Sequence, residues 1–338
     1  MQRADLPPPI SLLEPYDRSS SAVGEAAVSA PGWHGTRGRL DPPGEARERR
    51  RPLFHPARGW IRRTERATSH FLTRFVFPWV PGIGIPYSGL LGRQLVLSEA
   101  TIALAGLPAA FERMRILLIT DIHAGPFVDP PTLDELFERL CRLEPDLILI
   151  GGDVSSSSIR EIDRSRAAFE RLAAPLGVWA VLGNHDHYTG RPAAVIERLA
   201  SYGIRTLSNR SVALLRDGER LSLAGVDDLL MGKADLDAAL DDAVPPVVLL
   251  SHNPDLLFAA ARRGVALMLS GHTHAGQIRL PGLGVLVRQS RFRLDQGRYR
   301  FRQTELVVSR GVGAVGIPWR VQCPPEVVLL TLGRQPSS

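Results

Sequence analysis

Histidine, aspartate and asparagine side chains gather in five short clusters of this sequence, each directly after an apolar run. Imidazole nitrogens and carboxylate or amide oxygens are ligands that zinc, iron and manganese accept. The clusters contain no cysteine, so their composition favours a hydrolytic metal centre over a structural zinc site. The clusters are Asp121-Ile122-His123, Gly151-Gly152-Asp153, Gly183-Asn184-His185-Asp186, Ser251-His252-Asn253-Pro254 and Gly271-His272-Thr273-His274.

The order of the clusters is more informative than any one of them. Pairs such as Gly-Asp occur often by chance, and Asp or Asn beside Gly usually marks a turn. Five clusters in succession, each after an apolar run, are hard to explain in that way. Two metal ions about 3.5–4 Å apart can clamp both oxygens of an in-line phosphoryl displacement, and a shared carboxylate is the natural way to hold them so close.

The apolar runs predict buried strands, because they are short and bounded by turn-forming residues. Strands alternate with helical patterns, which predicts an α/β core, and a later hairpin with Asp217-Gly218 at its turn predicts mixed sheets in a two-sheet sandwich. Ligands bind outside the carboxyl ends of strands in open α/β sheets, so we expect the five clusters to converge. The predicted strands are 115–120, 147–150, 178–182, 247–250 and 265–269, and the predicted helices are 133–143, 160–173 and 192–201.

The composition narrows the function classes. The net charge is +6, but Lys233 is the one lysine among 41 basic residues, so arginine bias is a better explanation than a nucleic-acid-binding face. Cys141 and Cys323 show no CxxC spacing, which argues against a zinc knuckle or a disulfide framework. We therefore expect nucleic acid not to be a partner.

The N-terminal part differs from the rest. Residues 1–66 are rich in proline, serine and arginine and lack apolar periodicity, so we expect a disordered leader. Residues 67–93 are apolar but broken by prolines, which argues against a membrane helix. We expect this segment either to attach to a membrane surface or to pack on the catalytic body as a strap. In the first case it would expose the side chains Phe75, Phe77, Trp79, Ile83, Ile85 and Tyr87.

The five clusters, in this order, resemble those of the calcineurin-like metallophosphoesterase superfamily, over roughly residues 94–333. The words GHTHAGQIRLP, SRGVG and PPEVVLLTL are similar to the bacterial branch of membrane-associated phosphodiesterases. The resemblance implies a four-layered α/β/β/α sandwich and two divalent ions, Mn²⁺, Fe²⁺ or Zn²⁺. It implies one ion held by Asp121, His123, Asp153 and His274, and a second held by Asp153, Asn184, His252 and His272.

The resemblance also assigns roles beside the metals. His185 would contact the phosphate together with Asn184 and protonate the leaving oxygen, and Asp186 would orient His185 or cap its turn. Two departures bear on these roles. Val154 and four serines follow Asp153 where many members carry an acidic residue or lysine, and Ala275 replaces a glycine that usually follows the last motif.

We therefore expect a metal-dependent phosphoesterase, more specifically a phosphodiesterase, that acts on a lipid-linked phosphoester at the cytoplasmic face of a membrane. A pyrophosphate hydrolase of the UDP-diacylglucosamine type remains an open alternative. A nuclease is less favoured because no basic, aromatic-rich stripe lies near the clusters. An inactive binding module is less favoured because every ligand position is intact.

Overall fold

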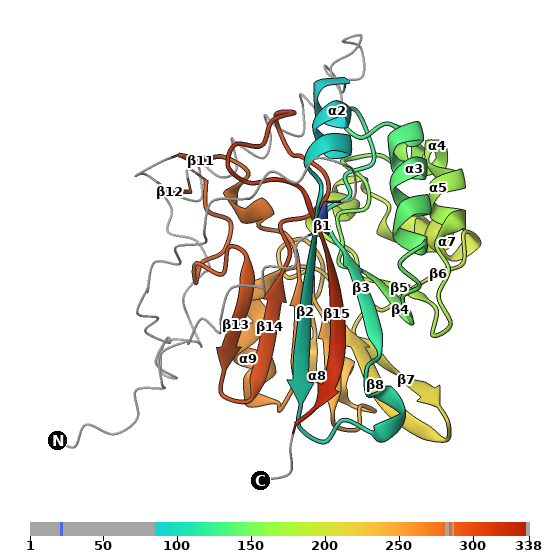
Figure 1. Ribbon diagram of the computed structural model, residues 1–338, viewed down its shortest axis with the longest axis vertical. Coiled ribbons are helices and arrows are strands. Elements are labelled where there is room, and N and C mark those ends of the chain that lie inside the picture. The colour runs from blue at the N-terminus through green and yellow to red at the C-terminus, as the bar shows by residue number, and fades with distance from the viewer. Residues whose placement is uncertain (1–20, 23–84, 281–283, 286, 336–338) are drawn as a thin grey trace, which may run out of the picture.

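Two mixed sheets lie face to face between layers of helices in the computed structural model, which describes residues 21–22, 85–280, 284–285 and 287–335 (Figure 1). The first sheet has the order β1-β2-β15-β3-β4-β5-β6. Its strands are β1 (Ser21–Ala22), β2 (Val96–Leu104), β15 (Glu326–Arg334), β3 (Arg115–Ile119), β4 (Leu147–Ile150), β5 (Val178–Ala180) and β6 (Ile204–Thr206).

The second sheet has the order β13-β14-β10-β9-β8-β7, and β11 (Arg279–Leu280) and β12 (Gly284–Val285) form a separate ribbon. Helices α2, α3, α4, α5 and α7 pack on the first sheet, and α8 and α9 on the second (Figure 1). The second sheet's strands are β13 (Gly297–Phe301), β14 (Thr304–Val308), β10 (Leu267–Ser270), β9 (Val247–Leu250), β8 (Glu219–Gly225) and β7 (Arg210–Arg216). The helices are α2 (Ile85–Gln94), α3 (Pro130–Cys141), α4 (Ile159–Arg164), α5 (Arg166–Arg171), α6 (Asn184–Tyr188), α7 (Pro192–Ser201), α8 (Leu236–Leu240) and α9 (Leu257–Arg262).

The continuous apolar strands explain the layering. In β3, Leu117 and Ile119 enter the core between sheet and helices, whereas Ile116 and Leu118 enter the core between the two sheets. Successive side chains of a strand point to opposite faces, so a strand covered on both faces must be apolar throughout. The strands β9 and β10 divide their side chains between two cores in the same way.

The structure confirms the expected sandwich of two mixed sheets and corrects some of its elements. The predicted helix over 160–173 is two helices, α4 and α5, which meet at the buried Ser165. The strands β2 and β13 and the helix α2 were not predicted. Within the described ranges, every helix is too short or too polar to cross a bilayer.

The N-terminal predictions fall largely outside the described residues. Of the predicted leader, only Ser21–Ala22 is described, and this two-residue strand pairs antiparallel with β2. The expected exposure of Phe75, Phe77, Trp79 and Ile83 also concerns residues outside the described ranges. Tyr87 is within them, and its expected exposure is wrong because its side chain is 0% exposed.

Tyr87 joins helix α2 to the catalytic body. Its hydroxyl lies 2.6 Å from the carbonyl oxygen of Val312 and 2.9 Å from that of Gly313, and it accepts a hydrogen bond of 3.1 Å from Nε of Arg320. Leu91, one helical turn further on, is also buried, in the core between the first sheet and its helices. The end of the apolar segment therefore packs on the sandwich.

Replacing Tyr87 by Phe tests how firmly α2 is held. The change leaves a buried carbonyl and the Arg320 guanidinium without the hydroxyl, so we expect the free energy of unfolding to fall by about 1–2 kcal/mol. Urea denaturation measures the loss. The matched control is Tyr202→Phe, because the Tyr202 hydroxyl makes only a 3.3 Å contact with the exposed Asp163. An equal effect of the two substitutions would contradict the special role of Tyr87.

Candidate metal centre

The five polar clusters meet at one edge of the two sheets, where parallel strands end. Backbone hydrogen bonds tie their loops together: the amide of Asp121 donates to the carbonyl of Gly152, and the amide of His123 to the carbonyl of Asp153. Gly271 donates in the same way to the carbonyl of His252, which joins the ends of β9 and β10. The expectation that strand ends would bring the clusters together agrees with this arrangement.

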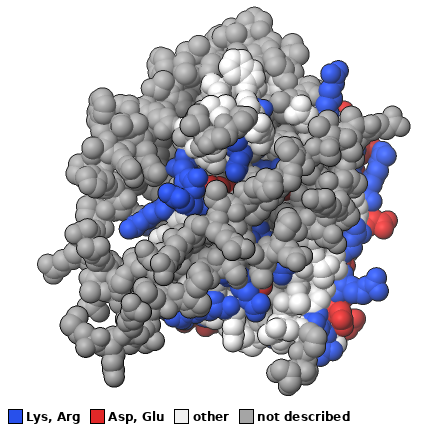
Figure 2. Space-filling view, turned by 60° about the vertical axis from the view of Figure 1, so that its left-hand side comes forward, with Lys and Arg blue, Asp and Glu red and all other residues white. Residues whose placement is uncertain are grey.

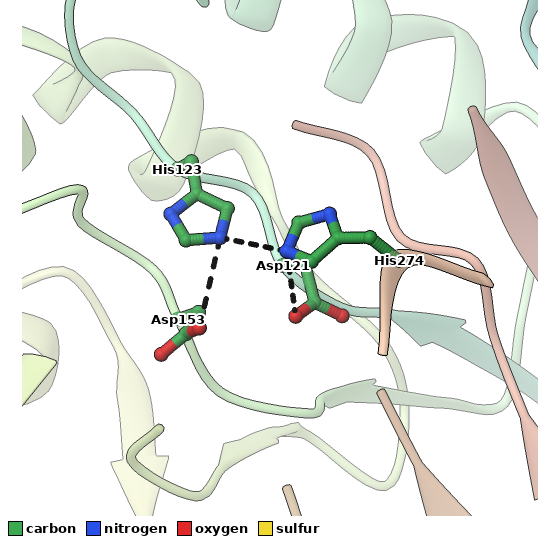
Figure 3. Close-up of side chains that lie close together, drawn as sticks. All are labelled: Asp121, His123, Asp153 and His274. Carbon is green, nitrogen blue, oxygen red and sulfur yellow. Dashed lines mark hydrogen bonds and ion pairs between the residues drawn. The ribbon is translucent and has the colours of Figure 1, made fainter. Parts of the chain in front are cut away.

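A first group of side chains, Asp121, His123, Asp153 and His274, offers one ligand atom each within 4.8 Å of one another (Figure 3). Nε2 of His123 lies 3.1 Å from Nε2 of His274 and 3.6 Å from Oδ2 of Asp153. Nε2 of His274 lies 3.4 Å from Oδ1 of Asp121. All four side chains are buried, which leaves two carboxylates in need of positive charge. The group is therefore suited to a divalent metal ion.

A second group lies on the other side of Asp153. Nε2 of His252 lies 3.2 Å from Oδ2 of Asp153 and 3.2 Å from Nδ1 of His272. Asn184 stands between Gly183 and His185, whose backbones both lie against Oδ1 of Asp153. A side chain at Gly183 would collide with Asp153, so this close approach requires glycine.

Two details of the second group fit a cation. Nδ1 of His252 lies 2.8 Å from the carbonyl oxygen of Gly151. A carbonyl can only accept, so Nδ1 carries the proton and Nε2 is left for a ligand bond. Oδ1 of Asn184 is buried and has no hydrogen-bond partner among the described residues. A buried amide oxygen without a partner is costly, and a cation would satisfy it.

The electrostatic surroundings keep most of these groups in the form that binds metal. Burial, together with neighbouring positive groups, lowers the pKa values of His123 and His274 well below the usual range, so both imidazoles are neutral. Burial raises the pKa of Asp121 to about 6. Burial opposes the charges of Asp153 and His252 as well, but their mutual attraction outweighs it: the pKa of Asp153 is lowered and that of His252 rises to about 10. A bound cation would take the place of the proton on His252.

The backbone at the centre adopts left-handed conformations that residues other than glycine rarely take. Asp121, His123, Asp153 and His274 have φ between 46° and 51°, and His272 has φ of 70°. Such conformations cost about 1–3 kcal/mol each and persist where the surrounding structure holds them, often at functional sites. Ala275, which stands in the place of a glycine, also has φ of 51°. The turn therefore does require positive φ, and the alanine adds strain to it.

His185 faces the first group from the start of α6. Its ring lies edge-on to that of His123, with centroids 4.6 Å apart, and its amide donates to Oδ1 of Asp153 over 2.8 Å. Its Nδ1 lies 2.7 Å from the carbonyl oxygen of Ser156. Nδ1 therefore carries a proton, and Nε2 is the nitrogen left to face a substrate.

Asp186 makes its hydrogen bonds with the backbone and with one hydroxyl. Its carboxylate accepts from the amides of Gly183, Val154 and Ser155 and from the Ser155 hydroxyl. The group against Nδ1 of His185 is the carbonyl of Ser156. The contacts of Asp186 are those of the alternative expectation, a cap of the turn.

Sequence reasoning missed three neighbours of the centre. The buried guanidinium of Arg320 lies 3.2 Å from Nδ1 of His274 and donates to the carbonyls of residues 310 and 311. Asp228 is buried after β8, beside the end of β9, and its pKa is raised by burial. Glu161 accepts from the serines after Asp153. Asp227-Asp228 directly after an apolar run, and the pattern Ser158-x-x-Glu161, were signals for the last two.

Comparison with known proteins agrees with this geometry. A model of the calcineurin-like phosphoesterase family matches residues 114–276. The metallophosphoesterase YkuE of Bacillus subtilis (strain 168) is 29% identical over 259 residues, covering 74% of this chain and 90% of the relative. A metallophosphoesterase of Aquifex aeolicus (strain VF5) is 31% identical and covers 73% and 95%. Phosphodiesterase YaeI of Escherichia coli (strain K12) is 32% identical and covers 64% and 82%. The chain therefore belongs to the calcineurin-like phosphoesterases, hydrolases of phosphoester bonds, as the order of its clusters predicts.

Proposed function

We propose that this chain is a phosphodiesterase with two divalent ions bridged by Asp153. The observation that carries the proposal is the position of Oδ2 of Asp153, 3.6 Å from Nε2 of His123 and 3.2 Å from Nε2 of His252. One oxygen thus faces both groups of ligands, and its partner oxygen is held by the amide of His185. The proposed ligands are Asp121, His123, Asp153 and His274 for one ion, and Asp153, Asn184, His252 and His272 for the other.

The chain's own residues would divide the work around those ions. Bound there, two such ions neutralise phosphate oxygens and lower the pKa of an attacking water. Asn184 and His185 lie at the start of α6, where they would contact the phosphate. His185 would act as the imidazolium, with both ring nitrogens protonated and Nδ1 held by the Ser156 carbonyl; it would donate the Nε2 proton to the leaving oxygen and remain as the neutral ring with its Nδ1 proton. The buried walls of the centre exclude water and strengthen each of these interactions.

The substrate class follows from charge and from the relatives. One relative is named a phosphodiesterase, which supports a diester substrate. Arg279 donates to the carbonyl of Ala275, next to His274, and Arg288 pairs with Asp295. Figure 2 brings the β11 side forward and shows basic side chains gathered there, with acidic ones between them. A face of this kind attracts anionic phosphoesters.

We further propose that the substrate is lipid-linked and that the part of residues 67–93 that precedes α2 attaches the enzyme to the cytoplasmic face of a membrane. The support is the apolar character of that segment and the arginines upstream of it, each of which would add about 1 kcal/mol near anionic headgroups. The burial of Tyr87 limits the attached part to residues before α2.

Removal of metal tests the proposed activity. Protein stripped with EDTA should lose at least ~10³-fold in kcat/KM on bis(4-nitrophenyl) phosphate, because the ions contribute several kcal/mol to the transition state. Adding Mn²⁺, Fe²⁺ or Zn²⁺ back in turn should restore activity, and elemental analysis should approach two ions per chain. The same assay with a phosphomonoester, a nucleotide pyrophosphate and a lipid phosphodiester in vesicles compares the substrate classes. Full activity after stripping, or one ion at saturation, would contradict the proposal.

A further inference from the structure

The run of serines after Asp153 forms a short loop, Ser155–Ser158, that lies against the centre. The side chains of Ser155, Ser156 and Ser157 are buried. The carbonyl of Ser156 faces Nδ1 of His185, and its hydroxyl donates to the carbonyl of His123 over 3.2 Å. We call this segment the serine loop. It is the part of the chain that fixes the His185 ring.

Glu161 holds the serine loop by a single oxygen. Its Oε2 accepts from the amides of Ser156, Ser157 and Ser158 over 3.0, 2.9 and 3.0 Å. The third of these hydrogen bonds belongs to the capping box that starts α4. In the same turn the Ser158 hydroxyl accepts from the amide of Arg160. Three amides that converge on one carboxylate oxygen form a rigid turn, because each hydrogen bond to a charged acceptor is strong.

The first of these hydrogen bonds leads directly to His185. Glu161 binds the amide nitrogen of Ser156, and His185 binds the carbonyl oxygen of the same residue, so the two side chains grip one residue at its two ends. Gly125 packs against this junction: a side chain there would meet the Ser156 hydroxyl at 2.9 Å and Oε1 of Glu161 at 3.1 Å. The junction therefore has little room to shift.

We propose that Glu161 is a positioning residue for the proton transfer by His185, acting through the serine loop. This rests on the proposed function, in which His185 protonates the leaving oxygen. Among the described residues, Glu161 hydrogen-bonds to Ser156, Ser157 and Ser158, none of which is a proposed metal ligand. It keeps the Ser156 carbonyl where that carbonyl fixes both the orientation and the Nδ1 proton of His185.

The charge state of Glu161 agrees with a tightly packed acceptor. Burial raises its pKa to about 7, even though the three amides and Arg164 favour the charged form. The Glu161 side chain is partly buried, which agrees with an acceptor packed into the junction.

The test compares variants of Glu161 on substrates that differ in their need for an acid. Diphenyl phosphate has a poorer leaving group than bis(4-nitrophenyl) phosphate and depends more on protonation. Glu161→Ala should lower kcat for diphenyl phosphate by between ~10- and ~100-fold, with a much smaller loss on the nitrophenyl ester and unchanged KM and metal content. Glu161→Gln, which keeps an acceptor oxygen at the same distance, should retain most of the wild-type kcat for diphenyl phosphate.

Two controls separate this inference from its alternatives. Asp235→Ala removes the cap of α8, a 3.0 Å bond to the amide of Ala238, and should lower stability without changing the ratio of the two kcat values. Glu161→Asp, a milder change that draws the oxygen back, should shift the same ratio if Glu161→Ala does not fold. An equal loss on both substrates, or none, in folded variants would overturn the positioning role. A wild-type protein inactive on both diesters would instead overturn the proposed function.

Discussion

Asp153→Asn is expected to remove both metal ions and lower phosphodiesterase activity by at least ~10³-fold. The substitution removes the negative charge that faces both groups of ligands and that would offset the repulsion between two nearby cations. The measurements are metal content by elemental analysis after reconstitution with Mn²⁺, and kcat/KM on bis(4-nitrophenyl) phosphate.

Asp146→Asn is the matched control, because Asp146 immediately precedes β4 and Asp153 lies beyond its other end. Its carboxylate accepts from the amide of Arg115 over 2.7 Å and pairs with Arg216, far from the ligands along the strand. This variant should keep both ions and its activity. If Asp153→Asn also kept two ions and full activity, the bridging role would be wrong. Loss of one ion alone would show that one of the two groups holds its ion without Asp153.

His185→Ala is expected to lower kcat by roughly 10²–10⁴-fold, the usual size of a general-acid contribution. The His185 amide, which binds Asp153, stays in place, so metal content should remain near that of the wild type. The loss should be smaller on bis(4-nitrophenyl) phosphate than on diphenyl phosphate, because nitrophenolate leaves without a proton.

His187→Ala serves as the comparison on the same helix. The ring of His187 binds Asp227 over 2.8 Å and does not face the ligand cluster, so kcat should stay within about threefold of the wild type. A loss for His185→Ala that is equal on good and poor leaving groups would argue for a purely electrostatic role. Such a result would remove the acid step from the mechanism and leave the metal ligands unaffected.

The sequence predicted the fold and the convergence of the polar clusters through one physical feature, whereas the division of ligands between two ions came from the resemblance to the family and stays a prediction. Runs such as Leu147–Ile150 are apolar throughout because both faces of the strand are covered, and polar residues directly after them must lie at the strand ends. This prediction does not require knowing that Ile116 and Ile119 of one strand lie in two different cores. Turn-forming residues after each run were enough to place Asp121, Asp153 and His252 at one edge.

The rest depended on contacts between distant residues, which no local pattern records. The partner of His185 is a backbone carbonyl. Every residue has one, so the sequence gives no sign of which carbonyl lies against His185. Arg320 looked like one of many arginines, although its guanidinium is buried against His274. Tyr87 lay in a segment whose apolar character fits both a membrane surface and a protein interior, and for Tyr87 itself the hydroxyl contacts with residues 312 and 313 show the protein interior.

The position of β15 has a consequence for how the protein folds during translation. β15 lies between β2 and β3, parallel to the first and antiparallel to the second, yet it is the last strand of the described chain. While the ribosome still holds that segment, β2 and β3 have no neighbour between them, and two apolar edges in mid-sheet stay open to wrong partners. Asp121 and His123 follow β3, so the metal centre should not close before β15 has emerged. We expect nascent chains to need protection, from a chaperone or from rapid release, until Glu326–Arg334 emerges.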